Sequence, residues 1–398
     1  MIASPQGTKP LALGPAQMIP AGGSPADGFE QRPVIVTPRG VDRWLAGVTA
    51  GLAGLGVVMV FGASFFLGAD RLGDPYLMAT RQAAFLAIAV LLAVVVSRIP
   101  VALLRKLAYP ALAAMLVLLV LVLVPGIGQV RGGARRWLSL GFVTFEPSEL
   151  LKPVFVLYLA HSLARKREKI HSFTYGVLPH LLVALVPMTL LMLQPDFGAT
   201  AVLALLTGAM LFVGGARPGQ LLALGLSGGS VGFCLVFFSD YRWKRVMGFL
   251  DPWADPLGKG FQLVQSYLAF GSGGVTGVGL GHSRQKLFYL PEGHTDFIFA
   301  LIGEEMGFLG GALVLLGFVV LALRGFRLAT RARDTFTSYL AFGLTFVVAM
   351  QAVLNIAVVM GCLPTKGMPL PLLSYGGSSL VTTVGMIAVL LSISREVR

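Results

Sequence analysis

Ten apolar segments, each long enough to cross a lipid bilayer, dominate this chain of 398 residues. A transmembrane helix needs about 20 mainly apolar residues to span ~30 Å of hydrocarbon. Within a bilayer the backbone must satisfy its own hydrogen bonds, so such segments fold as helices. Nine or eleven spans remain possible, because the fourth segment is short and the fifth nearly joins the sixth. The ten segments are 44–67, 79–97, 102–124, 149–164, 174–193, 197–214, 219–239, 296–323, 337–362 and 372–393.

The composition excludes an ordinary soluble protein. Hydrophobic residues make up 56% of the chain and charged residues 12%, whereas soluble domains carry about 45–50% and about 25%. We therefore expect an all-α polytopic membrane protein with a single domain over residues 43–398. Residues 1–42 are rich in proline and glycine and lack an apolar run. They are expected to form a flexible cytoplasmic tail rather than a cleaved signal peptide.

The Lys and Arg residues predict the orientation of the spans. With the N-terminus inside, 18 of the 31 Lys and Arg residues but only 6 of the 18 Asp and Glu residues are cytoplasmic. Because cytoplasmic connections carry an excess of Lys and Arg, we expect both termini inside. The outward basic residues fall mainly in 131–152 and 240–295, interleaved with tryptophans. This favours a cationic outer surface for an anionic, lipid-linked ligand over a solvated loop, and nucleic acid is not expected as a partner.

The connection 240–295 is too long for a simple turn, and its length indicates a functional loop. Its glycine-rich middle, residues 271–281, is followed by no Gly-Lys-Ser/Thr sequence, so a nucleotide-binding loop is not predicted. Glycine here is expected to let the backbone bend sharply or approach another helix. The histidines and the two cysteines are too dispersed for a metal site, and none is predicted.

Acidic residues border the helix that follows this loop. Glu292, His294 and Asp296 alternate just before an apolar segment. A carboxylate at the edge of hydrocarbon indicates function, although Asp296 or Thr295 could instead cap the helix. Two turns further on, one of the glutamates 304 and 305 is expected to face the bundle interior. Asn355, the only asparagine, is expected to form an interhelical hydrogen bond.

The segment 363–379 interrupts the helical pattern with three prolines. Irregular backbone at membrane depth is tolerated only where it is buried in protein or lines a wet cavity. Two interpretations remain open: a cavity lining that includes Lys366, Ser374, Ser378 and Ser379, or a tight extracellular turn.

Three motifs in this order resemble those of the SEDS family (shape, elongation, division and sporulation) of membrane peptidoglycan polymerases. The resemblance covers residues 42–398, and residues 142–143 depart from the family pattern without affecting a functional residue. Within the family the chain resembles the division type rather than the elongation type, through residues 251–256, 279–286 and 365–367. The three motifs are 136–138 with 147–152, 290–292 with 294–299, and 369–371 with 374–379.

The resemblance implies a reaction and the residues that perform it. Two lipid II molecules meet at the outer face, the 4-hydroxyl of one attacks C1 of the other, and undecaprenyl pyrophosphate leaves with inversion. Asp296 is then the catalytic carboxylate and base. A divalent cation, Mg or Mn, could assist the pyrophosphate, but no ligand set is visible. The residues implied in substrate binding or in ordering the loop are Arg136, Glu149, Lys152, Asp255, Glu292, His294, Lys366 and Ser378.

The resemblance also implies partners and a place in the cell. The expected partners are a class B penicillin-binding transpeptidase, other division proteins and membrane lipid. The expected location is the bacterial inner membrane at the division septum. A lipid II flippase and a non-catalytic division scaffold are the alternatives. A flippase needs charge along a path through the bilayer, whereas here the outlying charge gathers at one face.

Overall fold

The computed structural model describes residues 40–131, 133–139, 141, 144–286, 290 and 292–397. The tail expected over residues 1–42 lies outside the described residues, except for its last three. In the described part, eight helices are long and apolar enough to cross a membrane, and α4 and α6 complete the ten expected spans. They are α1 (Arg43–Leu67), α2 (Leu77–Val96), α3 (Val101–Leu123), α4 (Pro147–Arg165), α5 (Leu178–Leu193), α6 (Phe197–Val213), α7 (Pro218–Phe237), α10 (Ile298–Arg331), α11 (Thr335–Val359) and α12 (Gly377–Val397).

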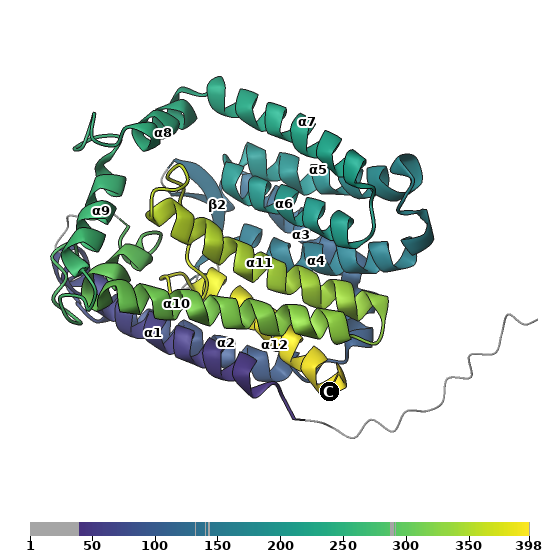
Figure 1. The fold of residues 1–398 in the computed structure, drawn as a ribbon, viewed down its shortest axis with the longest axis horizontal. Helices are drawn as coiled ribbons and strands as arrows, with labels where there is room; N and C mark the ends of the chain where they lie inside the picture. The colour runs from purple at the N-terminus through teal and green to yellow at the C-terminus, as the bar shows by residue number, and fades with distance from the viewer. Residues whose placement is uncertain are drawn as a thin grey trace, which may run out of the picture. The chain divides into compact units, whose positions relative to one another are not determined.

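Three helices form the centre of the bundle. The helices α4, α11 and α12 bury much of their surface, and α10 packs along α1 and α11 (Figure 1). By contrast, α7 has no buried residue and packs only against α6 and α8 (Asp240–Leu250) among the described elements with several contacts. A buried centre and an apolar periphery are typical of a helix bundle in lipid, because lipid tails are as apolar as the side chains that contact them.

Several short elements were not predicted. A three-stranded antiparallel sheet, ordered β1-β2-β3, joins α3 to α4 and consists of β1 (Gly128–Arg131), β2 (Ala134–Ser139) and β3 (Thr144–Phe145). The long loop contains α8 and α9 (Phe261–Gly273), at the left-hand end of the helices in Figure 1. Two π-helical turns, η1 (Gly68–Leu72) and η3 (Phe173–Val177), extend α1 and precede α5, and a 3₁₀ turn, η2 (Arg167–Lys169), follows α4.

The helix α10 is interrupted at Gly307, whose φ of 65° and ψ of −163° are not helical. The glycine-rich loop after α9 enters this interruption. Val278 and Gly279 donate backbone hydrogen bonds to the carbonyls of Glu304 and Glu305, and Phe308 donates to Gly274. A Cβ on Gly277 would lie 2.2 Å from the Glu305 carbonyl oxygen. The expected close approach of this loop to a helix is confirmed.

The connection from α11 to α12 is irregular and largely buried. The expected helix over 372–393 begins only at Gly377, so that prediction is wrong at its start. Leu372 has a φ of 67°, and the Ser374 hydroxyl accepts a hydrogen bond from the Leu370 amide, which stabilises a turn instead of a helix. Gln82, fully buried on α2, donates to the Ser374 carbonyl at 3.1 Å and accepts from the Gly376 amide at 3.4 Å. Residues 370–374 are therefore buried in protein, which argues against an exposed turn there, and the cavity lining stays a prediction.

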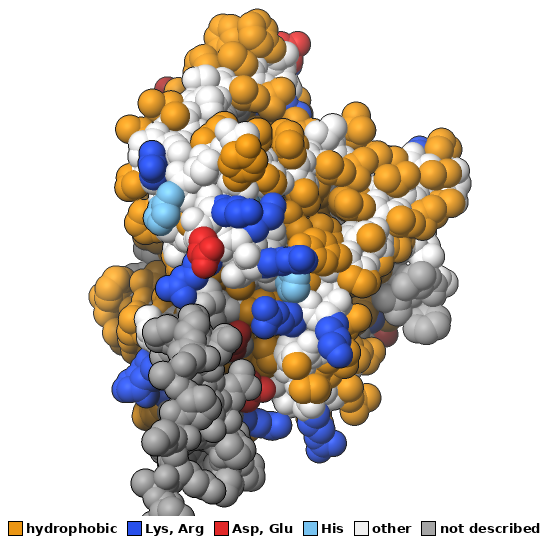
Figure 2. Space-filling view, turned by 90° about the vertical axis from the view of Figure 1, so that its right-hand side faces the viewer, with side chains coloured by type: hydrophobic (Ala, Val, Ile, Leu, Met, Phe, Trp, Pro, Cys, Tyr) orange, Lys and Arg blue, Asp and Glu red, His pale blue; other side chains and the backbone are white. Residues whose placement is uncertain are grey.

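The two ends of the described chain lie at the same end of the bundle. The Asp42 carboxylate caps α1 and pairs with Arg324 of α10, while its amide donates to Ser394 near the end of α12. Figure 2 shows this end, the right-hand side of Figure 1, where Lys and Arg side chains gather with few acidic ones. We call it the basic end, and the opposite end, where the sheet, α8 and α9 lie, the loop end.

Candidate functional site

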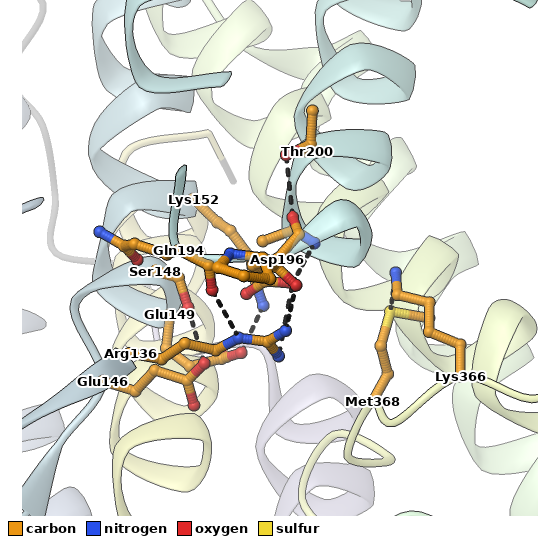
Figure 3. Close-up of polar contacts among 12 residues, drawn as sticks. Arg136, Glu146, Ser148, Glu149, Lys152, Gln194, Asp196, Thr200, Lys366 and Met368 are labelled. Atoms are coloured by element: carbon orange, nitrogen blue, oxygen red, sulfur yellow. Dashed lines mark hydrogen bonds and ion pairs between the residues drawn. The ribbon is translucent and has the colours of Figure 1, made fainter. Parts of the chain in front are cut away.

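A cluster of charged side chains lies at the loop end, where four parts of the chain meet. It consists of Arg136 from β2, Glu146, Glu149 and Lys152 from the start of α4, Asp196 before α6, and Lys366 from the α11–α12 connection. Figure 3 shows the first four gathered beside Asp196, with Lys366 to one side. We call these six residues the charged cluster. It brings together Arg136, Lys152 and Lys366, which come from separate segments of the sequence.

Arg136 is fixed against the turn between α5 and α6. Its guanidinium donates to the carbonyl of Gln194 at 3.3 Å and to that of Pro195, and it lies 3.7 Å from the Asp196 carboxylate. Asp196 also accepts a hydrogen bond from the Ala199 amide at 3.0 Å and so caps α6. Gln194 in turn donates to the Leu119 carbonyl of α3. The position of the guanidinium is thus set by three elements before any ligand binds.

Two carboxyl groups and one ammonium group share the start of α4. Lys152 pairs with Glu149 at 2.6 Å, and both side chains are buried. Burial and the neighbouring carboxylates of Glu149 and Asp196 raise the pKa of Glu146 to about 8. Ser148 donates a hydrogen bond to Glu146 at 2.9 Å, and the Glu146 amide donates to the Ser378 hydroxyl at 3.1 Å. Ser378 therefore helps to join α12 to the start of α4.

Lys366 extends across the N-terminus of α6. A Cβ on Gly198 would lie 2.2 Å from its Nζ, so only glycine leaves room for this side chain. The ammonium lies 3.1 Å from the Met368 sulfur, and no carboxylate of the described residues lies within 4 Å of it. Burial lowers the pKa of Lys366 to about 8, although Asp196 opposes the shift. This ammonium is thus available to an anionic ligand.

Asp296 lies beside the same connection. A Cβ on Gly367 would lie 2.7 Å from its Oδ2, so the carboxylate packs against the backbone of the residue that follows Lys366. Asn355 of α11 donates to the carbonyls of both Asp296 and Met368, at 2.8 and 2.6 Å. The expected hydrogen bonding of Asn355 is confirmed, but its partners are loops rather than a helix. This amide holds the acid and the Lys366 segment together.

The environment of Asp296 suits a base. Burial and the Glu292 carboxylate raise its pKa to about 7, while Arg245 on α8 lowers it. The helix α10 begins at Ile298 with Phe297 as its N-cap, and no side chain caps it. The interpretation of Asp296 or Thr295 as a helix cap is therefore wrong. A carboxyl group with a pKa near neutrality can exchange a proton at physiological pH.

Glu292 and His294 form the turn that presents Asp296. Glu292 has a φ of 56°, and its carbonyl accepts from the Thr295 and Phe297 amides. The Thr295 hydroxyl donates to the Glu292 carboxylate at 2.8 Å. The His294 carbonyl accepts from the Tyr375 amide, and the two rings lie 5.9 Å apart. Burial lowers the pKa of His294, although Glu292 opposes the shift.

The other expected residues have more local contacts. Asp255 is exposed in the turn before α9, where its carboxylate accepts from the Lys259 amide at 3.1 Å. No described contact joins it to the charged cluster. Glu304 and Glu305 are both buried, although only one was expected to face the interior. Glu304 accepts from the Arg284 amide at 2.9 Å and Glu305 pairs with Lys286 at 3.5 Å, so both secure the loop.

Sequence reasoning missed Glu146, Asp196 and Arg245 as members of this region. Asp196 lay between two predicted spans and was treated only as their boundary. Its signal was available, because an aspartate at the start of an apolar helix at membrane depth is both a cap and a functional candidate. Arg245 gave no such signal, because only the fold of α8 brings it near Asp296.

Comparisons with known proteins agree on one family. The profile of the FtsW/RodA/SpoVE family, described as cell cycle protein, matches residues 43–398. A probable peptidoglycan glycosyltransferase FtsW of Geobacter sulfurreducens is 42% identical over 343 residues, covering 86% of this chain and 92% of that protein. Stage V sporulation protein E of Bacillus subtilis is 42% identical over 357 residues, covering 90% and 98%.

Solved structures have the same fold. A chain of a peptidoglycan synthase complex, studied for the coordination of polymerization and crosslinking, superposes with a TM-score of 0.73 at 33% identity, covering 89% of this chain and 98% of that one. The rod shape determining protein RodA of Thermus thermophilus superposes with a TM-score of 0.67 at 30% identity, covering 90% and 97%. The expected all-α polytopic fold is confirmed.

Proposed function

The chain belongs to the FtsW/RodA/SpoVE family, and on this premise we propose that it is a peptidoglycan glycosyltransferase that polymerises lipid II at the outer face of the membrane. The observation that supports the proposal best is the junction at Gly367. There the Asp296 carboxyl, with a pKa of about 7, packs against the same connection that carries Lys366, whose ammonium no described carboxylate neutralises. Sugar transfer from a pyrophosphate needs such a base and such a cation.

Asp296 and the cations divide the reaction between them. The Asp296 carboxylate accepts the proton of the acceptor's 4-hydroxyl as the oxygen attacks C1 of the donor sugar. The bond from C1 to the pyrophosphate oxygen breaks, and the charge left on undecaprenyl pyrophosphate is stabilised by Lys366 with Arg136 and Lys152. Attack from the face opposite the leaving group inverts the α-linkage to β.

The supporting residues keep these groups in place. We propose that Glu149 orients Lys152, that Ser378 joins α12 to the start of α4, and that Glu292 and His294 present Asp296. Asp255 orders the turn before α9. The described residues include no group of three or more His, Cys, Asp or Glu side chains arranged to hold a metal ion. A divalent cation bound with the pyrophosphate, Mg or Mn, therefore stays a prediction.

The chain is a multi-pass inner-membrane protein. We propose that both termini are cytoplasmic, that it acts at the division septum, and that a class B penicillin-binding transpeptidase and other division proteins are its partners. The similarity to a chain of a peptidoglycan synthase complex supports a partner of this kind. The orientation is supported by Figure 2, because Lys and Arg gather at the end where both described termini lie.

The test is strand synthesis from labelled lipid II by the purified protein with its transpeptidase. Asp296→Asn keeps the side-chain size but removes the base, so polymerisation should fall about 10²–10⁴-fold. Binding of the transpeptidase should be unchanged. Asp240→Asn, at the exposed start of α8, is the matched control and should remain active. Near-normal synthesis by Asp296→Asn would contradict the assignment and favour the flippase or the scaffold alternative.

A further inference from the structure

A pocket at the basic end lies outside the site described above. It has a volume of about 680 Å³ and adjoins a second pocket of about 540 Å³, with Glu168 and His171 lining both. The walls come from η2, the start of η3, the α6–α7 turn and the start of α7, with Tyr339 of α11 lining the second pocket. Glycines close the turns tightly. A Cβ on Gly176 would lie 2.4 Å from the Lys169 carbonyl oxygen. The pocket is thus built into the backbone of two connections.

The lining of this double pocket is cationic. Arg167, Lys169 and Arg217 face a single acid, Glu168. None of these three cations lies within 4 Å of a carboxylate in the part of the chain that the structure describes. Ion pairs in the described chain involve only Arg136, Lys152, Lys286 and Arg324, so it is the convergence of the three cations on one hollow that distinguishes them. Three unpaired cations around one hollow indicate an anionic ligand, since Arg and Lys bind phosphate through charge-assisted hydrogen bonds.

Two helix N-termini add to the positive potential. The helical span Phe173–Leu193 and α7 both begin at the pocket, and neither has a side-chain cap. Uncapped amides at a helix N-terminus favour an anion. Independently, Gln220 donates to the His171 carbonyl at 3.3 Å, while its Oε1 is buried and accepts nothing from the described residues.

The position of the pocket indicates a lipid. Phe173 and Tyr175 lie on its rim and are 42% and 70% exposed at the start of a spanning helix. Aromatic side chains at that position belong to the interface of a bilayer. A phosphate held here would be at headgroup level, with the acyl chains beside the apolar surface of α5. The general excess of Lys and Arg at this end (Figure 2) needs no pocket and no convergent helix N-termini.

We propose that this double pocket binds the headgroup of an anionic glycerophospholipid, such as phosphatidylglycerol. The phosphate is bound by Arg217, Lys169 and Arg167. The site is distinct from the lipid II site, because the charged cluster lies at the loop end. Through this site, the positions of the α4–α5 connection and of the start of α7 depend on the lipid composition of one leaflet.

Native mass spectrometry of the purified full-length protein tests this proposal. Phosphatidylglycerol is titrated into the detergent-solubilised protein, with phosphatidylcholine as the neutral comparison. The double variant Lys169→Gln/Arg217→Gln should weaken retention of the first phosphatidylglycerol about tenfold or more, because each cation near a lipid headgroup contributes about 1 kcal/mol. The control Arg327→Gln/Arg331→Gln removes two exposed cations near the end of α10 and should change retention less than about twofold.

Two other readouts decide the nature of the ligand. Equal losses in the pocket pair and the control pair would overturn the proposal in favour of diffuse surface charge. Displacement of phosphatidylglycerol by inorganic phosphate at similar concentration would also overturn it, since the site would then recognise a soluble anion.

Discussion

The pH dependence of polymerisation should depend on two groups, Asp296 and Lys366, which lie beside or on the connection between α11 and α12. Asp296, with a pKa of about 7, must be deprotonated to act as the base, so the rate falls as the pH drops below that value. Lys366, with a pKa of about 8, must be protonated to stabilise the leaving pyrophosphate, so the rate falls as the pH rises above it. The expected profile is a narrow bell centred between about 7 and about 8.

The structure also predicts how this bell moves. Glu292 raises the pKa of Asp296 and Arg245 lowers it. Glu292→Gln should therefore shift the acid limb to lower pH, and Arg245→Gln should shift it to higher pH. At pH 6 only about a tenth of Asp296 is ionised, so a fall of its pKa by the first full unit raises the rate there about fivefold. Burial is the larger cause of the raised value, so Glu292→Gln should restore only part of the ordinary pKa.

The assay is the initial rate of glycan synthesis from labelled lipid II between about pH 5 and about pH 10, about two units beyond each limb, at saturating transpeptidase. The matched controls are Asp240→Asn and Lys244→Gln, which remove an acid and a base from exposed positions on α8. Neither should move the acid limb. The reasoning would be refuted if Glu292→Gln and Arg245→Gln left the acid limb in place or shifted it in the same direction. The acid limb would then report the titration of a group other than Asp296.

Two glycines give further tests. Gly198→Ala should displace the flexible end of Lys366, so polymerisation should fall at least about tenfold while the melting temperature stays nearly unchanged. Adding Lys366→Gln should cause no further loss of activity. An additive loss would show that Gly198→Ala does not act through Lys366. Gly307→Ala places a Cβ 2.3 Å from the Gly277 amide nitrogen at a φ of 65°. It should therefore lower the free energy of unfolding by about 2–4 kcal/mol and the melting temperature by several degrees. The control is Gly311→Ala, whose Cβ would make ordinary contacts, and equal melting temperatures of the two variants would refute the reasoning.

The spans were predictable because their signal is local. Length and hydropathy alone decide whether a segment can cross a bilayer, and ten helices lie where ten segments were expected. The boundaries failed where backbone conformation rather than hydropathy decides. Residues 372–376 are apolar enough for a helix, but the positive φ of Leu372 and the buried hydroxyl of Ser374 stabilise a turn.

The site was predictable only in its motifs. Asp296, Arg136, Lys152 and Lys366 were named from sequence, whereas their proximity depends on contacts between distant segments. Asn355 illustrates the limit. Its hydrogen bonding was expected from a polar residue in an apolar helix, but the choice of the Asp296 and Met368 carbonyls follows from the α11–α12 connection. The sheet that holds Arg136 was missed because strands of two to six residues give no periodicity.

The interruption at Gly307 divides α10 into a short first segment, which follows Asp296, and a longer second segment. Its first turns, which follow Asp296, take hydrogen bonds from the glycine-rich loop at Val278 and Gly279. A displacement of α9 would therefore reach the segment next to Asp296 through the glycine-rich loop, without passing through the longer second segment of α10. A partner that binds the long loop 240–295 would thus be linked to Asp296 by a short path, while the longer part of α10 is held at Arg324 by Asp42.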